Sequence, residues 1–190
     1  MDQENGSVRQ QRRHYEYLQE LQAMASTLPV QIQQRLPLEV LSNLANALLD
    51  ETVFDIVAGL QEIQQMTEKT LSESRSKLVQ QQLNERVEKQ RRHRDQLQSN
   101  QAAPHRLPLI QRENERELKE HDEAAASNLD KADRRIIAEL DQLVVQQQST
   151  LEKAGVPGFF VTSNPQEIQV QMQLLIFIIG LSEKRVSNGT

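Results

Sequence analysis

The chain has 190 residues, contains no cysteine and carries a formal net charge of −5 at pH 7. Hydrophobic residues make up 37% of it and aromatic residues 3%, below the roughly 45–50% apolar share of ordinary globular domains. The missing cysteines exclude a disulfide framework and thiolate metal ligation, and the acidic balance gives no overall attraction to nucleic acid or anionic lipid. Such a composition is typical of long amphipathic helices with narrow apolar seams.

The first fifty residues predict a disordered end followed by short helices. Residues 1–8 are polar, and we expect them to be disordered because nothing in them can be buried to offset the entropy of ordering. From Arg9, apolar residues recur at steps of three and four, which places them on one face of a helix. Pro29 and Pro37 then divide residues 9–50 into short helices, since proline fits only the first turn.

Residues 51–154 predict two long helices that fold back on each other. The first is apolar at its start and then becomes rich in Gln, Glu, Lys and Arg, with a gapped seam. Residues 99–108 hold two prolines and turn-prone residues, so we expect the chain to reverse there. A second helix of similar length favours an antiparallel, coiled-coil-like hairpin. Gln147 and residues 80–82 fall where apolar side chains are expected, which should weaken the seam.

Residues 146–167 interrupt the helical pattern and are predicted to form a structural joint. Glycine and proline end the preceding helix, and Gly155 is expected in the left-handed conformation of a C-cap. Phe159 and Phe160 are predicted to be buried in the core, with an exposed contact for a partner as the alternative. The joint is predicted to comprise Gly155, Pro157, Gly158, Phe159, Phe160, Asn164 and Pro165.

Residues 155–185 are predicted to contain this loop and an apolar C-terminal helix, followed by a loose tail at residues 186–190. Six consecutive apolar residues begin at Leu174, and a helix that is apolar all round is normally buried. The segment is too short to cross a bilayer, so we expect it to pack against residues 53–63. Alternatively it forms an oligomer or partner interface, with a membrane-surface role as the third choice. The residues predicted for such an interface are Leu174, Leu175, Phe177 and Ile178.

Catalytic and metal-binding motifs are not recognised anywhere in the chain. It lacks the nucleophile elbow, the zinc-protease helix motif and the phosphate-binding loop. The four histidines are scattered among polar runs, so we expect solvated side chains rather than clustered ligands. We therefore predict no enzyme activity, no cofactor and no catalytic, cofactor-binding or metal-binding residue.

Basic residues cluster at residues 86–94. Lys89, Arg91, Arg92 and Arg94 of this stretch are a candidate nuclear-import or phosphate-binding patch. The alternative is a solvated face of the helix that is balanced by the acidic run at residues 113–123 in the returning helix. This balance disfavours nucleic-acid binding, and no interleaved aromatic residues support stacking on single strands.

Two long segments resemble the gonadal protein family, which includes the vertebrate DiGeorge syndrome critical region 6 products. They are QQRLPLEVLSNLANALLDETVFDIVAGLQEIQQMTEKTL at residues 33–71 and QQSTLEKAGVPGFFVTSNPQE at residues 147–167. The shorter stretches RHYEYLQEL and HRLPLIQ match as well. The resemblance implies a protein without accepted catalytic activity or cofactor, mainly nuclear, and connected with the gonad and with development.

Residues and resemblance together predict a non-enzymatic, all-α interaction or scaffold protein with a role in gonad or germ-line development. We expect protein partners, including other copies of the chain, and no membrane span. The nucleus is favoured over the cytoplasm. The alternative function is a nuclear, nucleic-acid-associated protein that uses residues 86–94.

Overall fold

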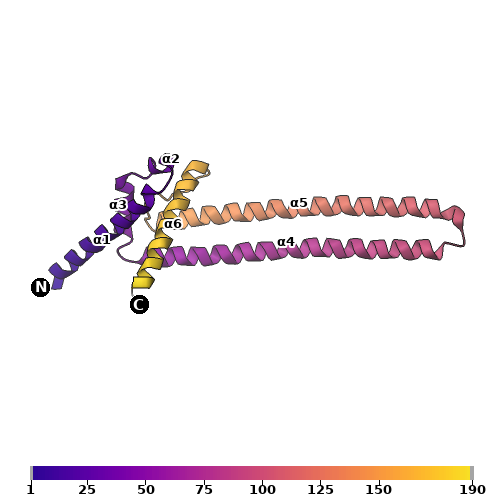
Figure 1. Cartoon of the computed structure of the whole chain (residues 1–190), viewed down its shortest axis with the longest axis horizontal. Helices are drawn as coiled ribbons and strands as arrows, with labels where there is room; N and C mark the ends of the chain where they lie inside the picture. The colour runs from indigo at the N-terminus through magenta and orange to yellow at the C-terminus, as the bar shows by residue number, and fades with distance from the viewer. Residues whose placement is uncertain (1, 189–190) are drawn as a thin grey trace. The chain divides into compact units, whose positions relative to one another are not determined.

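A computed structural model describes the chain from Asp2 to Asn188 and confirms the predicted all-α class. Within these residues the elements are six α-helices and one 3-10 helix, and no strand is present. In chain order they are α1 (Asp2–Ser26), α2 (Val30–Gln33), α3 (Leu38–Ala47), α4 (Thr52–Ser99), η1 (Pro104–Arg106), α5 (Leu107–Lys153) and α6 (Pro165–Asn188) (Figure 1).

The chain divides into two compact units, which are described separately below. The first unit, here called the head, is formed by residues 1–65 and 142–190. The second unit, here called the hairpin, is formed by residues 66–141. Helices α4 and α5 therefore each contribute one part to the head and another to the hairpin.

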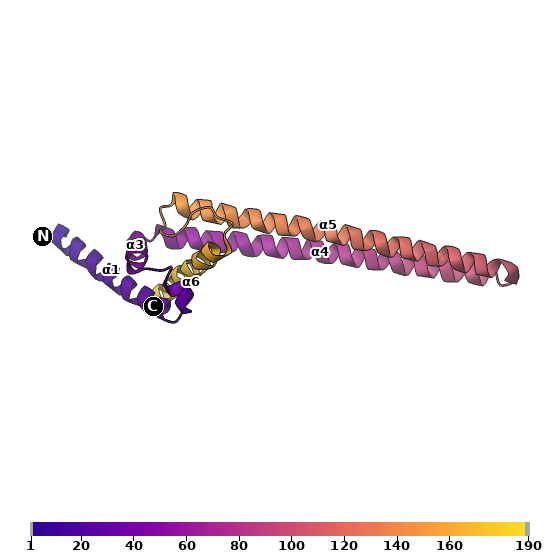
Figure 2. The same cartoon turned by 90° about the horizontal axis from the view of Figure 1, so that it is seen from above.

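In the hairpin, α4 and α5 lie side by side and run in opposite directions, as both views show (Figures 1 and 2). The chain leaves α4 through successive short turns, in which the Ala103 amide donates to the Asn100 carbonyl at 2.9 Å. Pro104 then opens η1, where its fixed φ suits a first turn and its missing N–H is not needed. The reversal therefore lies within residues 99–108, and the two helices form the long pair that the sequence predicts.

The head holds the apolar core of the molecule. Helices α1 and α3, the first turns of α4, the last turns of α5 and α6 all contribute buried side chains to one cluster. Fully buried are Leu21, Leu44, Leu48, Leu151, Leu174 and Ile178. Helix α6 joins this cluster together with Val53, Phe54 and Val57 of α4, as expected from its apolar sequence. This packing gives the C-terminal segment a structural role.

The outer helices extend further than the sequence predicts. Helix α1 begins at Asp2, whereas disorder was expected through residue 8, and α6 continues to Asn188, beyond the expected end at residue 185. Adding a residue to an existing helix costs far less than starting one, so polar ends can continue a helix that the core has already fixed. The predictions for residue 1 and for residues 189–190 lie outside the described residues.

Candidate functional site

The predicted joint begins with a glycine-terminated end of α5. Gly155 has a φ of 73°, and its amide donates to the Glu152 carbonyl at 2.9 Å. The amide of Val156 reaches back to the Leu151 carbonyl at 3.0 Å, and the Val156 side chain is buried. These two bonds and the buried residue after the glycine are the features of a Schellman cap. Gly155 therefore adopts the left-handed C-cap conformation that the sequence predicts.

The rest of the joint brings the chain against α6 and starts that helix. Gly158 has a φ of 82°, and a Cβ at this position would lie 2.6 Å from Cδ1 of Leu174, so only glycine fits without a shift. Asn164 then caps α6, because its Oδ1 accepts from the Gln166 amide at 2.9 Å, and Pro165 occupies the first helical position. Both glycines and the Asn-Pro pair thus shape the backbone here.

The two phenylalanines of the joint lie in different environments. Phe159 is 6% exposed and belongs to the core cluster, as the sequence predicts. Phe160 is 41% exposed, so the expectation that it is buried was wrong. The loop is extended here, and successive side chains of an extended chain point to opposite sides. One phenylalanine is therefore available to a partner and the other is not.

Two buried glutamines, which sequence reasoning missed as structural residues, hold this loop in place. Gln148 of α5 donates to the side-chain oxygen of Gln171 of α6 at 2.9 Å and to the Thr162 carbonyl at 3.2 Å. Gln171 donates to the Phe160 carbonyl at 2.9 Å, and the Thr162 amide donates to Gln148. Both glutamines are almost fully buried. Their polar atoms are therefore paired with the backbone of the loop, as buried polar groups require.

The residues predicted as an interface on α6 lie mainly inside the head. Leu174, Phe177 and Ile178 are buried in the core cluster, and Leu175 is partly buried against it. These three buried residues are occupied by contacts within the chain and do not offer a surface to a partner. The side of α6 that remains exposed carries Met172 at 57% and Ile176 at 53% exposure, which the sequence analysis did not single out. The apolar pattern of the sequence predicted that α6 is buried, but it did not predict which side of the helix remains exposed.

Those two residues border a groove in the head, here called the apolar groove. Its volume is about 260 Å³, and it lies between the end of α5, the joint and α6. The lining residues are Gln64, Val144, Gln147, Gln148, Leu151, Phe159, Ile168, Gln171, Met172, Leu175 and Ile176. Gln147, predicted to weaken the helix seam, donates a hydrogen bond to Gln64 at 3.0 Å. The groove therefore has an apolar floor with amide groups beside it.

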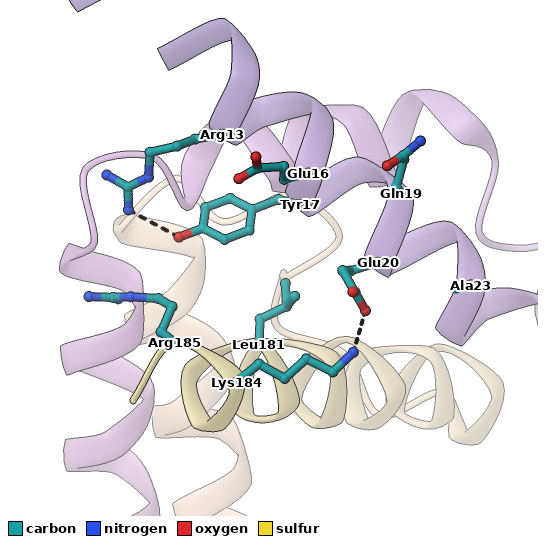
Figure 3. Close-up of a pocket in the computed structure, with 9 residues that line it drawn as sticks. All are labelled: Arg13, Glu16, Tyr17, Gln19, Glu20, Ala23, Leu181, Lys184 and Arg185. Carbon is teal, nitrogen blue, oxygen red and sulfur yellow. Dashed lines mark hydrogen bonds and ion pairs between the residues drawn. The ribbon is translucent and has the colours of Figure 1, made fainter. Parts of the chain in front are cut away.

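A second groove of about 690 Å³ lies between α1 and α6, where Figure 3 shows Tyr17 and Leu181 between the charged side chains. Lys184 of α6 pairs with Glu20 of α1, and Arg13 and Arg185 both pair with Glu51, at 2.5 and 2.7 Å. The hydrogen bond from Arg13 is the main reason why the pKa of Glu51 is lowered. These cations are neutralised within the chain, so the groove connects helices and offers little charge to an anionic ligand.

In the hairpin, most of the predicted basic patch is neutralised by acidic residues. The pairs are Arg86 with Asp122, Lys89 with Glu117, Arg92 with Glu117 and Arg91 with Glu88, at 2.7 to 3.5 Å. Arg94 has no ion-pair partner among the described residues. The acidic run of α5 thus lies against the basic stretch of α4. This agrees with the alternative interpretation, in which the basic residues form a solvated helix face balanced by that acidic run. A role of Lys89, Arg91, Arg92 and Arg94 in nuclear import stays a prediction.

Two histidines in the hairpin are not solvated, contrary to expectation. His93 is 8% exposed, and its Nε2 lies 2.8 Å from Oε2 of Glu117. The side chain of His121 is 11% exposed and lies between Glu85 and Asp122. Hydrogen bonds from Lys89 and then from His93 lower the pKa of Glu117 to about 2. Polar residues thus occupy the contact between the two helices.

The described residues contain neither a metal-binding group of side chains nor a membrane-spanning helix. In the part of the chain that the structure describes, no three histidine or acidic side chains are grouped closely enough to hold a metal ion. Among the same residues, no helix combines the length and the apolar character that a membrane span needs.

Comparison with known proteins identifies the family. The DiGeorge syndrome critical region 6 (DGCR6) protein family matches residues 1–190. Protein DGCR6 from Gallus gallus is 47% identical over 176 residues, which cover 93% of this chain and 87% of that protein. Gonadal protein gdl from Drosophila melanogaster is 37% identical over 179 residues, or 94% of this chain and 84% of that protein. No solved structure matches the chain. In agreement with the resemblance seen in the sequence, the chain belongs to the DGCR6 family, together with the gonadal protein of Drosophila.

Proposed function

We propose that this chain is a non-enzymatic interaction protein whose head binds a helical segment of a partner protein in the apolar groove. Exposure of Met172 and Ile176 beside this groove is the observation that carries the proposal. The two residues are one helical turn apart and therefore lie on the same side of α6. An amphipathic partner helix binds such grooves through apolar residues at the same spacing.

The energetics favour a partner of this kind. Covering two large apolar side chains stabilises a complex by up to about 1.5–3 kcal/mol each, before the cost of association is subtracted. Phe160 and Val161 of the joint are also exposed, although neither lines the apolar groove. At the edge of the apolar groove, the side-chain oxygen of Gln147 can accept a hydrogen bond from a polar group of a partner helix. Apolar anchors beside adaptable polar groups are typical of protein interfaces.

The nucleic-acid alternative receives less support from the same structure. Four cations of the basic stretch, Arg86, Lys89, Arg91 and Arg92, already contact carboxylates of the chain. A phosphate would have to replace these carboxylates, so fewer counterions would be released on binding.

Nuclear localisation and a role in gonad development are also part of the proposal. The name of the Drosophila relative makes the gonad the first tissue to examine.

Affinity purification with two matched variants tests the proposal. Ile176→Glu places a charge beside the apolar groove, while Val30→Glu makes the same change at an exposed position of α2. Quantitative mass spectrometry first identifies the proteins that co-purify with the unaltered chain. We expect the Ile176→Glu variant to lose these proteins and the Val30→Glu variant to retain them. Circular dichroism should show equal helix content for all three proteins. An identical set of partners for both variants would contradict binding at this groove.

A further inference from the structure

The hairpin has almost no apolar interior of its own. Among its described residues, the only side chains that are less than 9% exposed are His93 and Asn114, and both are polar. Large apolar side chains lie outside instead, with Val79, Leu83 and Val87 recurring along α4 at steps of four. Residues at this spacing lie on one side of a helix. This pattern indicates a surface that another molecule covers.

Part of that side borders a third groove, here called the hairpin groove. It has a volume of about 540 Å³ and lies between α4 and α5. The lining residues are Val87, Gln90, His93, Arg94, Leu97, Gln111, Asn114, Glu115 and Leu118. Apolar residues from both helices are thus interspersed with polar ones, as in helix bundles where polar residues determine the register of the helices.

The two buried polar residues of the hairpin groove each have one side-chain atom without a hydrogen-bond partner among the described residues. Nε2 of His93 must donate to Glu117, because a carboxylate only accepts, and this leaves Nδ1 buried without a hydrogen bond. Nδ2 of Asn114 is also buried and unpaired among the described residues. Buried polar atoms without partners are rare and costly, at about 1–3 kcal/mol each. The polar contacts inside the hairpin are therefore incomplete, and its interior contributes little to its stability.

The charges of the hairpin groove indicate what that molecule is. Arg94 of α4 and Glu115 of α5 both line the groove, and neither forms an ion pair with any described residue. One groove therefore carries one free positive and one free negative charge, on opposite helices. A surface with this property is complementary to itself under two-fold symmetry.

We propose that the hairpin groove is an interface for a second copy of this chain, so that two hairpins form a four-helix bundle. The proposal rests on the proposed function as an interaction protein and names one partner. The contact of His93 with Glu117 places Arg94 and Glu115 at about the same level along the hairpin. With both hairpins pointing the same way, α4 of each copy lies on α5 of the other, and Arg94 meets the second copy's Glu115. In the opposite orientation α4 lies on α4, and like charges meet.

Charge exchange tests this arrangement in the full-length protein. Arg94→Glu and Glu115→Arg each place like charges across the interface, so each variant alone should self-associate about tenfold or more weakly than the unaltered chain. An equimolar mixture of the two variants brings opposite charges together at both contacts and should restore association. Sedimentation equilibrium over a range of concentrations measures all three samples, with circular dichroism as the check on folding.

The three samples distinguish pairing between two copies from contacts within one chain. Restored association in the mixture supports pairing between copies, because pairing within one chain could not be rescued in this way. An unaltered chain that stays monomeric, single variants that associate normally, or a mixture that remains monomeric would each overturn the proposal. None of these results would affect capture of other proteins by the head, which the Ile176→Glu variant tests separately.

An apolar position provides a second test that does not depend on the charges. Val87→Glu changes a residue that lines the hairpin groove, whereas Leu109→Glu makes an equivalent change at an exposed position two residues from Gln111, on the other side of α5. We expect about tenfold weaker self-association for Val87→Glu and no change for Leu109→Glu. Equal association of both variants would place the interface elsewhere and overturn the proposal.

Discussion

The head and the hairpin are both built from α4 and α5, yet only the head has an apolar core. In the head, α4 contributes Val53, Phe54 and Val57 to a cluster that also includes buried residues of five other helices. In the hairpin, the same helix contributes Lys89 and His93 to contacts with Glu117. The difference shows that a long helix can continue well beyond the residues that stabilise it, if a neighbouring helix offers polar partners.

This comparison also indicates where the stability of the protein lies. Exposed ion pairs such as Arg75 with Asp133, at 2.7 Å, contribute little, because water and salt screen their charges. Burying a large apolar side chain contributes about 1.5–3 kcal/mol. The head should therefore dominate the free energy of unfolding, while the hairpin depends on many small contributions and on whatever covers its apolar residues.

Removing a core side chain of the head should have the largest effect. Phe159→Ala leaves a cavity in the core cluster and is expected to lower the free energy of unfolding by about 3–5 kcal/mol. Phe160→Ala is the matched control, because its ring is largely exposed, and it should cost less than about 1 kcal/mol. Chemical denaturation of both variants measures the difference, and equal effects would contradict the distinct environments of the two rings.

A smaller loss is expected from breaking the glutamine contacts that hold the joint. Gln171→Leu removes the bond to the Phe160 carbonyl and the bond that Gln148 donates to Gln171, and should cost about 1–3 kcal/mol. Gln169→Leu makes the same substitution at an exposed position two residues earlier. Thermal denaturation should show a lower midpoint for Gln171→Leu only. A midpoint at or above that of the unaltered chain would show that the bonds do not stabilise the loop.

The smallest effect is expected in the hairpin, and it should depend on pH. Lys89 and His93 lower the pKa of Glu117 from its ordinary value of 4.5 to about 2. A carboxyl group with a lowered pKa stabilises the folded state above the ordinary pKa, and this contribution is lost as the pH falls from 4.5 towards 2. Glu117→Gln should therefore weaken the dependence of stability on pH in this range.

Glu113→Gln is the control for that experiment, since among the described residues Glu113 pairs only with the exposed Arg116 three residues away. Denaturation at a series of pH values between 5 and 2 compares the three proteins. The contribution of Glu117 is small because its side chain remains 41% exposed. An identical pH dependence in all three proteins would mean that these contacts do not hold the hairpin together.

Much of this fold could be predicted because its signals are local. Proline and glycine mark the ends of helices, so Pro104, Gly155 and Asn164 lie where the backbone turns or a helix starts. Apolar spacing likewise identified α6 as a buried helix. Local patterns of this kind do not need knowledge of the neighbouring helices.

What the sequence left undetermined depends on contacts between distant residues. Composition alone could not separate the buried Gln171 from the exposed Gln169, since the difference arises from the joint packed against α6. The solvated surroundings predicted for His93 were wrong for the same reason, because Glu117 reaches it from the other helix. Which side of α6 carries the exposed Met172 and Ile176 is likewise decided by how the head packs.

Hydrogen–deuterium exchange measured at several protein concentrations tests the contrast between head and hairpin most directly. Amides of the buried head helices should exchange slowly at every concentration, because they open only with global unfolding. Amides at residues 66–141 should exchange faster in dilute solution and slow down as the concentration rises, when second copies cover the hairpin groove. Hairpin amides as well protected as those of the head, in a sample shown to be monomeric, would contradict the account.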